Sequence, residues 1–266
     1  MRKHILGLIV ALAGFVGVAQ ASPIMPTFAG APAGWNVDRY APASFSDVGT
    51  YQGRSDVLGI GISTNDGYGS RPSGYNDTFY DTQGESHPVS GGAGDTLSAD
   101  LFVPRDWANP SLGARRTGMW GVMNKDANGN VSGYPIIGFT NDGTDGFVGF
   151  RTWDDSGLGA WHDLANAVNY DGWNTLSILF TGSVFKYSIN GVLADTIAAD
   201  PSAKNFSSVI MQAYNFAGDP ALGEVVANDY TAHWSNTKSV PEPGTFALAG
   251  IAIIGIGATR RRKMAS

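Results

Sequence analysis

The chain offers few side chains that could carry out catalysis. It contains no Cys, which excludes a thiol nucleophile, and it lacks the Gly-x-Ser-x-Gly motif of serine hydrolases. His87, His162 and His233 are far apart in the sequence and show no metal-ligand spacing. We therefore predict no catalytic residue and no metal ligand among them, and expect histidines at the surface or packed in the core.

The carboxylates also give no catalytic pattern. Cleavage of a glycosidic bond needs two opposed carboxyl groups. Between residues 22 and 240 only Glu85 and Glu224 are glutamates, and both fall in predicted loops, which favours an exposed position. Asp154 and Asp155 precede Ser-Gly, a sequence typical of a turn. We expect that the protein is not an enzyme.

One loop partly matches a calcium-binding sequence. Asn124-x-Asp126-x-Asn128-Gly129 resembles the start of the D-x-[DN]-x-[DN]-G loop. It begins with Asn, however, and its twelfth position is Pro135, where a bidentate Glu is needed. A tight hairpin loop explains the sequence better, so we predict no cofactor and keep calcium as the weaker alternative.

Aromatic residues are dense in one region, at Trp153, Trp161, Tyr170 and Trp173. Saccharide-binding clefts combine exposed aromatic faces with Asp and Asn hydrogen bonds, and the chain is rich in both kinds of residue. An aromatic residue in a strand more often belongs to the core. These four residues are our candidates for glycan binding, with core packing as the alternative.

The elements that must position these residues are predicted to be strands. Apolar residues alternate with small or polar ones, and Gly, Asn and Asp mark the turns. A meander is indicated over 173–197, with Asn190-Gly191 as a type I′ turn. The stretch 64–95 is polar and is interpreted as an ordered loop. The predicted strands are 58–62, 97–103, 119–123, 134–140, 147–153, 173–180, 184–189, 192–197, 209–214 and 230–234.

Many short strands and almost no helix predict an all-β fold, an antiparallel β-sandwich or jelly roll. A fibronectin-type sandwich is the alternative, although a domain of about 200 residues is too long for one such unit.

Residues 22–240 carry 11 Lys and Arg against 22 Asp and Glu, a net charge of −11. Such a surface repels nucleic acid, so no nucleic-acid partner is expected.

The N-terminus has the pattern of a signal peptide. Arg2 and Lys3 precede an apolar stretch, and Ala19-Gln20-Ala21 forms an A-x-A cleavage site for signal peptidase. A retained anchor is the alternative. Residues 22–34 are rich in Pro and Ala and are expected to form a flexible leader.

The C-terminus combines three features in order. Val240-Pro241-Glu242-Pro243 is followed by an uncharged apolar stretch at 246–258 and by Arg260, Arg261 and Arg262. As a helix the apolar stretch is about 20 Å long, short of a hydrocarbon core of about 30 Å, but snorkelling arginines extend its reach. We expect a short transmembrane helix with its basic end in the cytoplasm. A buried core helix is the alternative.

This tail resembles the PEP-CTERM sorting signal. The resemblance implies that Val240, Pro241, Glu242 and Pro243 are recognised by an exosortase, a membrane-embedded protease-transpeptidase of exopolysaccharide-producing Gram-negative bacteria. It also implies that Arg260, Arg261 and Arg262 are the stop signal. The expected location is the cell envelope, outer surface or extracellular matrix, after transient anchoring in the inner membrane.

A weaker resemblance concerns the middle of the chain. The strand pattern over 145–236 is similar to the concanavalin A-like, or laminin G-like, jelly rolls. Glycosidases of that fold usually carry Glu-x-Asp-x-x-Glu along one strand, and this spacing is absent from the sequence.

These observations divide the chain and indicate its role. We expect a non-enzymatic structural or interaction protein linked to exopolysaccharide. A lectin-like carbohydrate-binding module is the first alternative and a polysaccharide-cleaving enzyme the second. The expected division is a signal peptide (1–21), a flexible leader (22–34), a β-sandwich domain (35–236), a linker with Pro-Glu-Pro (237–245), an apolar helix (246–259) and a basic end (260–266).

The calcium interpretation can be tested directly. We expect that millimolar calcium leaves the melting temperature unchanged, because the loop after Asn124 lacks the bidentate Glu of a calcium site. The measurement is a thermal melt with and without calcium, with magnesium as the control. A rise of several degrees with calcium alone would establish a calcium site.

Overall fold

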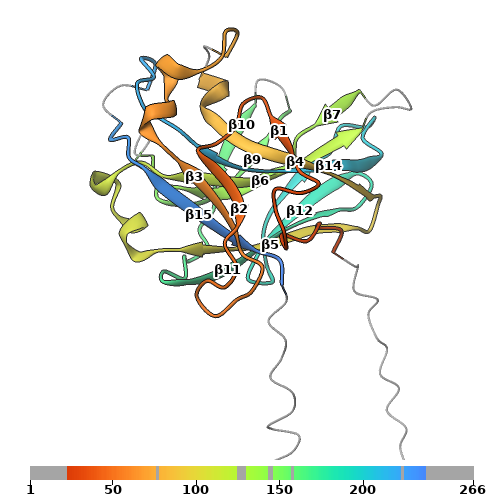
Figure 1. The fold of residues 1–266 in the computed structure, drawn as a ribbon. Coiled ribbons are helices and arrows are strands. Elements are labelled where there is room, and N and C mark those ends of the chain that lie inside the picture. Colours follow the sequence, from red (N-terminus) through yellow and green to blue (C-terminus); the bar gives the residue numbers. More distant parts are fainter. Residues whose placement is uncertain are drawn as a thin grey trace, which may run out of the picture.

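The computed structural model describes residues 23–75, 78–124, 130–142, 146–156, 159–222 and 225–237. Within these residues two antiparallel sheets of eight and seven strands, called sheet I and sheet II here, pack face to face (Figure 1). The predicted antiparallel β-sandwich is confirmed. The signal-peptide and membrane helices expected at the two ends lie outside the described residues.

Sheet I carries the site described below. Its strand order is β1 (Asn36–Asp38), β4 (Thr82–Gly91), β14 (Asn205–Tyr214), β6 (Arg116–Asn124), β8 (Ile136–Thr140), β9 (Gly149–Asp154) and β10 (Ala160–Asp163), with β7 (Val131–Gly133) paired to β6. Sheet II has the order β13 (Val192–Ala198), β12 (Val184–Ile189), β11 (Gly172–Phe180), β5 (Thr96–Val103), β15 (Tyr230–Ser235), β3 (Leu58–Ile62) and β2 (Ser44–Asp47).

Short 3₁₀ helices connect some of these strands. They are η1 (Thr64–Asp66), η2 (Tyr68–Ser70), η3 (Thr78–Asp81), η4 (Arg105–Ala108) and η5 (Pro110–Leu112). No helix within the described ranges is long and apolar enough to cross a membrane.

The predicted meander is confirmed as β11, β12 and β13. Burial alternates along β11, so that Leu176, Ile178 and Phe180 face the core. The turn into β13 has positive φ angles of 51° at Asn190 and 78° at Gly191, as a type I′ turn requires. The core between the sheets is built from such alternating side chains of both sheets.

Strand β4 corrects the interpretation of 64–95 as a loop. Its ten residues pair with both β1 and β14 in sheet I. The strand has no apolar alternation, because its buried positions are filled by Thr82, Gln83, Gly84 and Glu85. Gln83 donates to the carbonyl of Ala41 at 2.9 Å, so hydrogen bonds replace apolar packing there.

The segment 23–34, expected to be a flexible leader, is packed into the domain. Phe28 has no exposed surface and its ring lies 5.9 Å from that of Trp35. The Ile24 N–H donates to the Thr96 carbonyl at 3.0 Å, and Asn236 donates to the Pro26 carbonyl. The two ends of the described chain therefore leave the domain beside each other, at the bottom of Figure 1.

The packing of this segment gives a first prediction. Phe28→Ala should lower the free energy of unfolding by about 3 kcal/mol or more, since it removes a fully buried aromatic ring. Urea unfolding is the measurement. The exposed Val37→Ala is the control and should change stability by less than about 0.5 kcal/mol. Equal effects of the two substitutions would mean that the leader is not part of the core.

Candidate functional site

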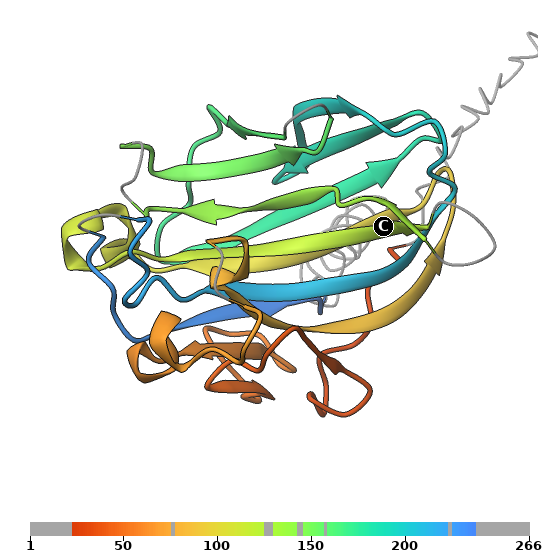
Figure 2. The same ribbon diagram turned by 90° about the horizontal axis from the view of Figure 1, so that it is seen from above.

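A cavity of about 360 Å³ opens on the outer face of sheet I. In Figure 2 the strands β4, β14, β6, β8 and β9 run side by side across the molecule. The residues that line the cavity come from β6, β8, β9, β10 and β14 and from segments beside them. Asp81 at the end of η3 and residues of the loop after β14 supply one wall. The lining residues are Asp81, Arg116, Trp120, Tyr134, Ile136, Asp142, Trp153, Trp161, Tyr214, Phe216 and Leu222.

Strand register explains why these residues meet. On β6 the residues facing outward are Arg116, Gly118 and Trp120, because side chains of a strand alternate between its two faces. Trp120 pairs with Ile210 of β14 and Ile136 of β8, and both belong to the same apolar cluster. The sheet thus carries apolar residues on its outer face as well as in the core.

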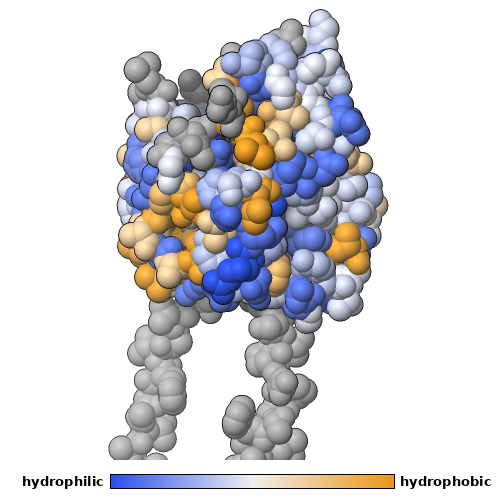
Figure 3. Space-filling model, turned by 90° about the vertical axis from the view of Figure 1, so that its left-hand side faces the viewer, coloured by the Kyte–Doolittle hydropathy of each residue, from blue (hydrophilic) through white to orange (hydrophobic). Residues whose placement is uncertain are grey.

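Two tryptophans form one side of the cavity. Trp153 of β9 and Trp161 of β10 are cross-strand partners, and their ring centroids are 4.9 Å apart. Opposite them, Tyr214 and Phe216 stack with centroids 5.8 Å apart. Figure 3 views the left-hand side of the molecule in Figure 1 and shows several hydrophobic patches at the surface there. Aromatic pairs of this kind present rigid apolar faces to a ligand.

Arg116 occupies the centre of the site. Its guanidinium lies 4.0 Å from the Trp161 ring and 4.4 Å from the Tyr214 ring, which is a double cation–π contact. Its Nη1 is 3.3 Å from Asp142, whose carboxylate also accepts from the Thr140 hydroxyl at 2.7 Å. The side chain is therefore held in place before any ligand arrives.

A tyrosine of sheet II supports this arrangement from the core side. The Tyr230 hydroxyl oxygen accepts from the backbone N–H of Tyr214 at 3.1 Å and of Arg116 at 3.3 Å. It lies 2.8 Å from the carbonyl oxygens of the same two residues, so it can donate to either. Burial raises the pKa of Tyr230 far above its ordinary value, so the phenol stays protonated.

A buried charge cluster holds the loop wall of the cavity. Arg71 pairs with Asp81 and lies 3.6 Å from Asp219, and all three side chains are almost fully buried. The pKa of Asp81 is raised to about 7, mainly by burial and also by Asp219, while Arg71 acts in the opposite direction. One guanidinium thus faces two carboxyl groups, and Asp81 holds its proton to a higher pH than an ordinary Asp does.

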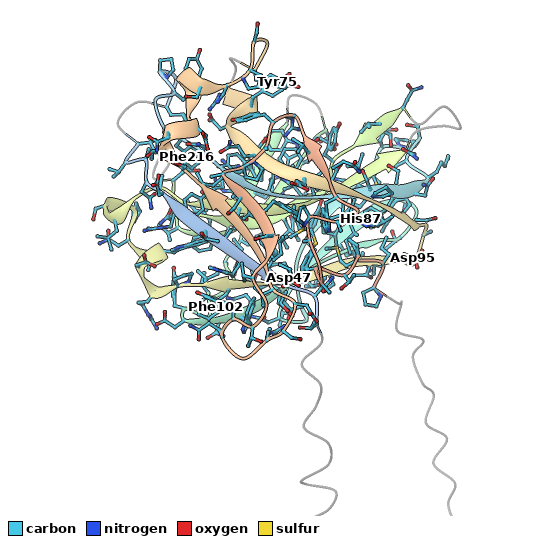
Figure 4. All side chains as sticks on the ribbon, in the orientation of Figure 1. Asp47, Tyr75, His87, Asp95, Phe102 and Phe216 are labelled. Atoms are coloured by element: carbon cyan, nitrogen blue, oxygen red, sulfur yellow. The ribbon has the colours of Figure 1, made fainter. Side chains whose placement is uncertain are left out.

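The structure separates the four predicted glycan-binding residues. Trp153 and Trp161 line the cavity on sheet I. Trp173 of β11 lies on the outer face of sheet II, where its indole donates to the Gln52 carbonyl at 3.0 Å, and Tyr170 lies beside Arg105. In Figure 4 the label of Phe216 marks the cavity side, and that of Phe102, a neighbour of Trp173, marks the opposite side.

The other sequence candidates are dispersed. Glu85, expected at the surface, is buried in β4, and this burial raises the pKa of its carboxyl group. His87 contacts Trp35, His162 bonds Asp195 at 3.0 Å, and the ring of His233 stacks on Tyr51 at 3.8 Å. Glu224 lies outside the described residues, as do 125–129 of the calcium-like loop and 238–266 with the sorting motif and arginines.

Metal binding finds no further support in the described part of the chain, where no three His, Asp or Glu side chains are grouped closely enough to hold an ion. The cleavage-site residues Ala19 and Ala21 precede the first described residue.

Sequence reasoning missed Arg116, Trp120 and Tyr214 as site residues. A signal was present for two of them. Trp120 and Tyr214 occupy the face of β6 and β14 opposite the core residues Met119 and Ala213, and aromatic residues on the outer face of a strand indicate a second apolar surface. Asp81 gave no such signal, because its pairing with Arg71 depends on how the loop folds.

Comparison with known protein families matches residues 239–263 to the PEP-CTERM protein-sorting motif. The sorting signal expected from the sequence is therefore confirmed. It implies an exported protein that an exosortase sorts to the cell surface. No curated protein matches the chain.

The chain has low-identity matches among solved structures. The chain is similar to a β-glucanase from Bacillus licheniformis, with TM-score 0.46 and 14% identity over 81% of this chain and 97% of that one. It is also similar to the carbohydrate-binding module CBM66 from Bacillus subtilis (TM-score 0.35, 14% identity, 68% and 91%).

A GlcNAcα1-4Gal-releasing endo-β-galactosidase from Clostridium perfringens gives TM-score 0.44 and 12% identity over 81% of this chain. The present chain spans 64% of that enzyme. At these identities the likeness concerns the fold alone.

The Asp81 cluster predicts a pH dependence of stability. The folded state keeps the proton up to a pH of about 7, whereas the ordinary pKa of an Asp is 3.8, so this group stabilises the fold at low pH. Its contribution is lost as pH rises from about 4 through 7. Asp81→Asn, which cannot ionise, should therefore gain stability relative to the wild type over this range.

Thermal melts of both proteins between pH 4 and pH 8 measure this difference. Asp56→Asn, at a surface turn, is the control and should run parallel to the wild type. A constant difference between Asp81→Asn and the wild type would show that Asp81 is ionised throughout the range.

Proposed function

We propose that this protein is a cell-surface saccharide-binding protein, and that its β-sandwich binds sugar in the cavity on sheet I without cleaving it. The observation that carries the proposal is the cavity itself, about 360 Å³ of space walled by Trp120, Trp153, Trp161, Tyr134 and Tyr214. Its volume is in the range typical of small-molecule sites.

The chemistry of the lining suits a sugar. The faces of aromatic rings pack against the C–H groups of a pyranose, while charged and amide groups bind its hydroxyls. Here the rings surround one fixed guanidinium, that of Arg116, and two carboxyl groups, those of Asp81 and Asp142. A concave site lined mainly by aromatic rings, with a few convergent polar groups, has the form of a small-molecule binding site.

The sorting signal supports a surface location. Residues 239–263 match the PEP-CTERM motif, and the described chain ends at Thr237, just before it. In Figure 1 that end leaves the domain at the bottom, while most strands of sheet I lie in the upper part. The cavity is lined by residues on the outer face of sheet I. A domain attached through its C-terminal side would present the cavity away from the membrane, toward extracellular polysaccharide.

The carboxyl groups of the cavity favour a second candidate, cleavage of the bound polysaccharide. Asp81 and Asp142 both line the cavity, and an acid with a pKa of about 7 can donate a proton at neutral pH. Release of reducing ends from polysaccharide separates this candidate from binding alone. Activity that disappears in Asp81→Asn would favour the enzyme.

Binding is tested with a glycan array and then by calorimetry with the glycans retained. Trp161→Ala should weaken binding at least tenfold, because it removes an aromatic wall and one of the two rings that hold Arg116. Trp173→Ala is the matched control, a half-buried tryptophan on the opposite sheet, and should bind as the wild type does.

Thermal melts establish that both variants are folded. Loss of binding in Trp173→Ala alone would move the site to sheet II. Absence of binding to any saccharide by the folded wild-type protein would contradict the proposal and favour a structural role in the matrix.

A further inference from the structure

The floor of the cavity contains a small recess. Gly118 of β6 and Gly138 of β8 are register partners, so two adjacent strands present no side chain at the same level of the sheet. Above them lies a recess of about 10 Å³, bounded by the side chains of Arg116, Arg151 and Trp120, among others. This volume holds one water molecule or one hydroxyl group.

The two glycines differ in what they permit. A Cβ atom on Gly138 would lie 2.2 Å from the Thr117 carbonyl oxygen, so the close approach of the strands requires glycine there. A Cβ atom on Gly118 would lie 3.4 Å from its nearest neighbours, the Ile137 carbonyl oxygen and the Trp120 indole nitrogen, which is an ordinary contact. The fold tolerates alanine at Gly118, and the recess is the space that alanine would fill.

Two buried side chains with unused hydrogen-bonding groups lie at or near this recess: Arg116 lines it, and Gln212 is on the neighbouring strand. Gln212 of β14 is the register partner of Gly118 on the other side of β6. Its side chain is fully buried, and both its amide oxygen and its amide nitrogen lack a partner. Nη2 of Arg116 is likewise buried without a partner. Buried polar groups are normally paired, and unpaired ones are often found where a ligand supplies the partner.

The charges around the cavity are already balanced. Among the described residues, each nearby guanidinium has a carboxyl partner within the protein and leaves no surplus positive charge for an anionic ligand. The pairs are Arg116 with Asp142 at 3.3 Å, Arg151 with Asp163 at 2.6 Å, Arg39 with Asp38 at 3.1 Å, and Arg71 with Asp81 and Asp219. A carboxylated or sulfated sugar would have to compete with these carboxylates and meet an acidic domain.

We propose that the cavity selects a neutral saccharide and seats one of its hydroxyl oxygens in the recess above Gly118, next to Arg116 and Gln212. This inference rests on the proposed function and adds the ligand class and the residues that determine it. A hydroxyl group can both donate and accept a hydrogen bond. It can therefore pair with the amide of Gln212, whose oxygen and nitrogen both lack a partner, and accept from Nη2 of Arg116. The aromatic walls then hold the ring whose hydroxyl enters the recess.

The ligand class is tested by calorimetry with defined tetrasaccharides. The probes are neutral oligomers of glucose, galactose and mannose, and uronate oligomers of the same length. We expect at least one neutral tetramer to bind at least tenfold more tightly than every uronate tetramer at physiological salt. Tighter binding of a uronate would overturn this inference and leave the proposed function standing. Absence of binding to every probe would overturn both.

The recess is tested with the neutral tetramer that binds best. Gly118→Ala should weaken binding at least tenfold, because its methyl group occupies the place of the hydroxyl. Gly92→Ala is the matched control, since its added Cβ meets nothing within 4 Å, and should leave affinity unchanged. Unchanged affinity in a folded Gly118→Ala protein would exclude the recess as the site of recognition.

Gln212→Met distinguishes a ligand-binding role from a structural one. The substitution removes the amide and keeps the length of the side chain. If the amide serves the ligand, affinity should fall at least tenfold while the melting temperature stays the same or rises, because no internal hydrogen bond is lost. A lower melting temperature with unchanged affinity would show that Gln212 stabilises the fold and does not contact the ligand.

Discussion

The geometry of the site depends on polar contacts that strand β15 of sheet II makes with sheet I. Tyr230 joins the backbones of Arg116 and Tyr214 through its hydroxyl group. Trp234 donates to the Thr117 hydroxyl at 3.0 Å, which in turn donates to the Gln212 carbonyl at 2.6 Å. A buried hydrogen bond contributes only about 1 kcal/mol, but leaving one unmade costs more. These contacts therefore fix how sheet I lies on sheet II where the cavity floor is built.

Sheet I has an apolar outer face in addition to its core face. An antiparallel sheet usually buries one face and leaves the other polar. Sheet I instead carries Trp120, Ile136, Ile210 and Tyr214 outward, where neighbouring side chains such as Trp153, Trp161 and Leu222 bury them. The cavity lies beside Trp120, Ile136 and Tyr214, where this cover leaves a gap. The site is therefore a property of one sheet and its wall loops, while sheet II and the core serve as its rigid support.

The loop wall depends on a cluster that is costly to bury. The guanidinium of Arg71 contacts the carboxyl groups of both Asp81 and Asp219, and all three side chains are buried away from water. Such clusters contribute little net stability, but removing one partner leaves an uncompensated charge. Asn215, whose N–H donates to the Asp81 carbonyl at 2.7 Å, ties the same loop to the end of β14. The wall is thereby held by a few specific contacts and is sensitive to pH.

The sequence alone determined the all-β class, the meander with its Asn190-Gly191 turn and the C-terminal sorting motif. These are local patterns, set by alternation along one strand, by turn chemistry or by residues in consecutive order. Only the tertiary structure decided that Trp153 and Trp161 share a cavity with Arg116 and Tyr214 while Trp173 lies on the other sheet. It also decided that β4 is a strand and that Phe28 belongs to the core. Those outcomes depend on which strands pair and in which register, and pairing brings together residues far apart in the chain that no local pattern specifies.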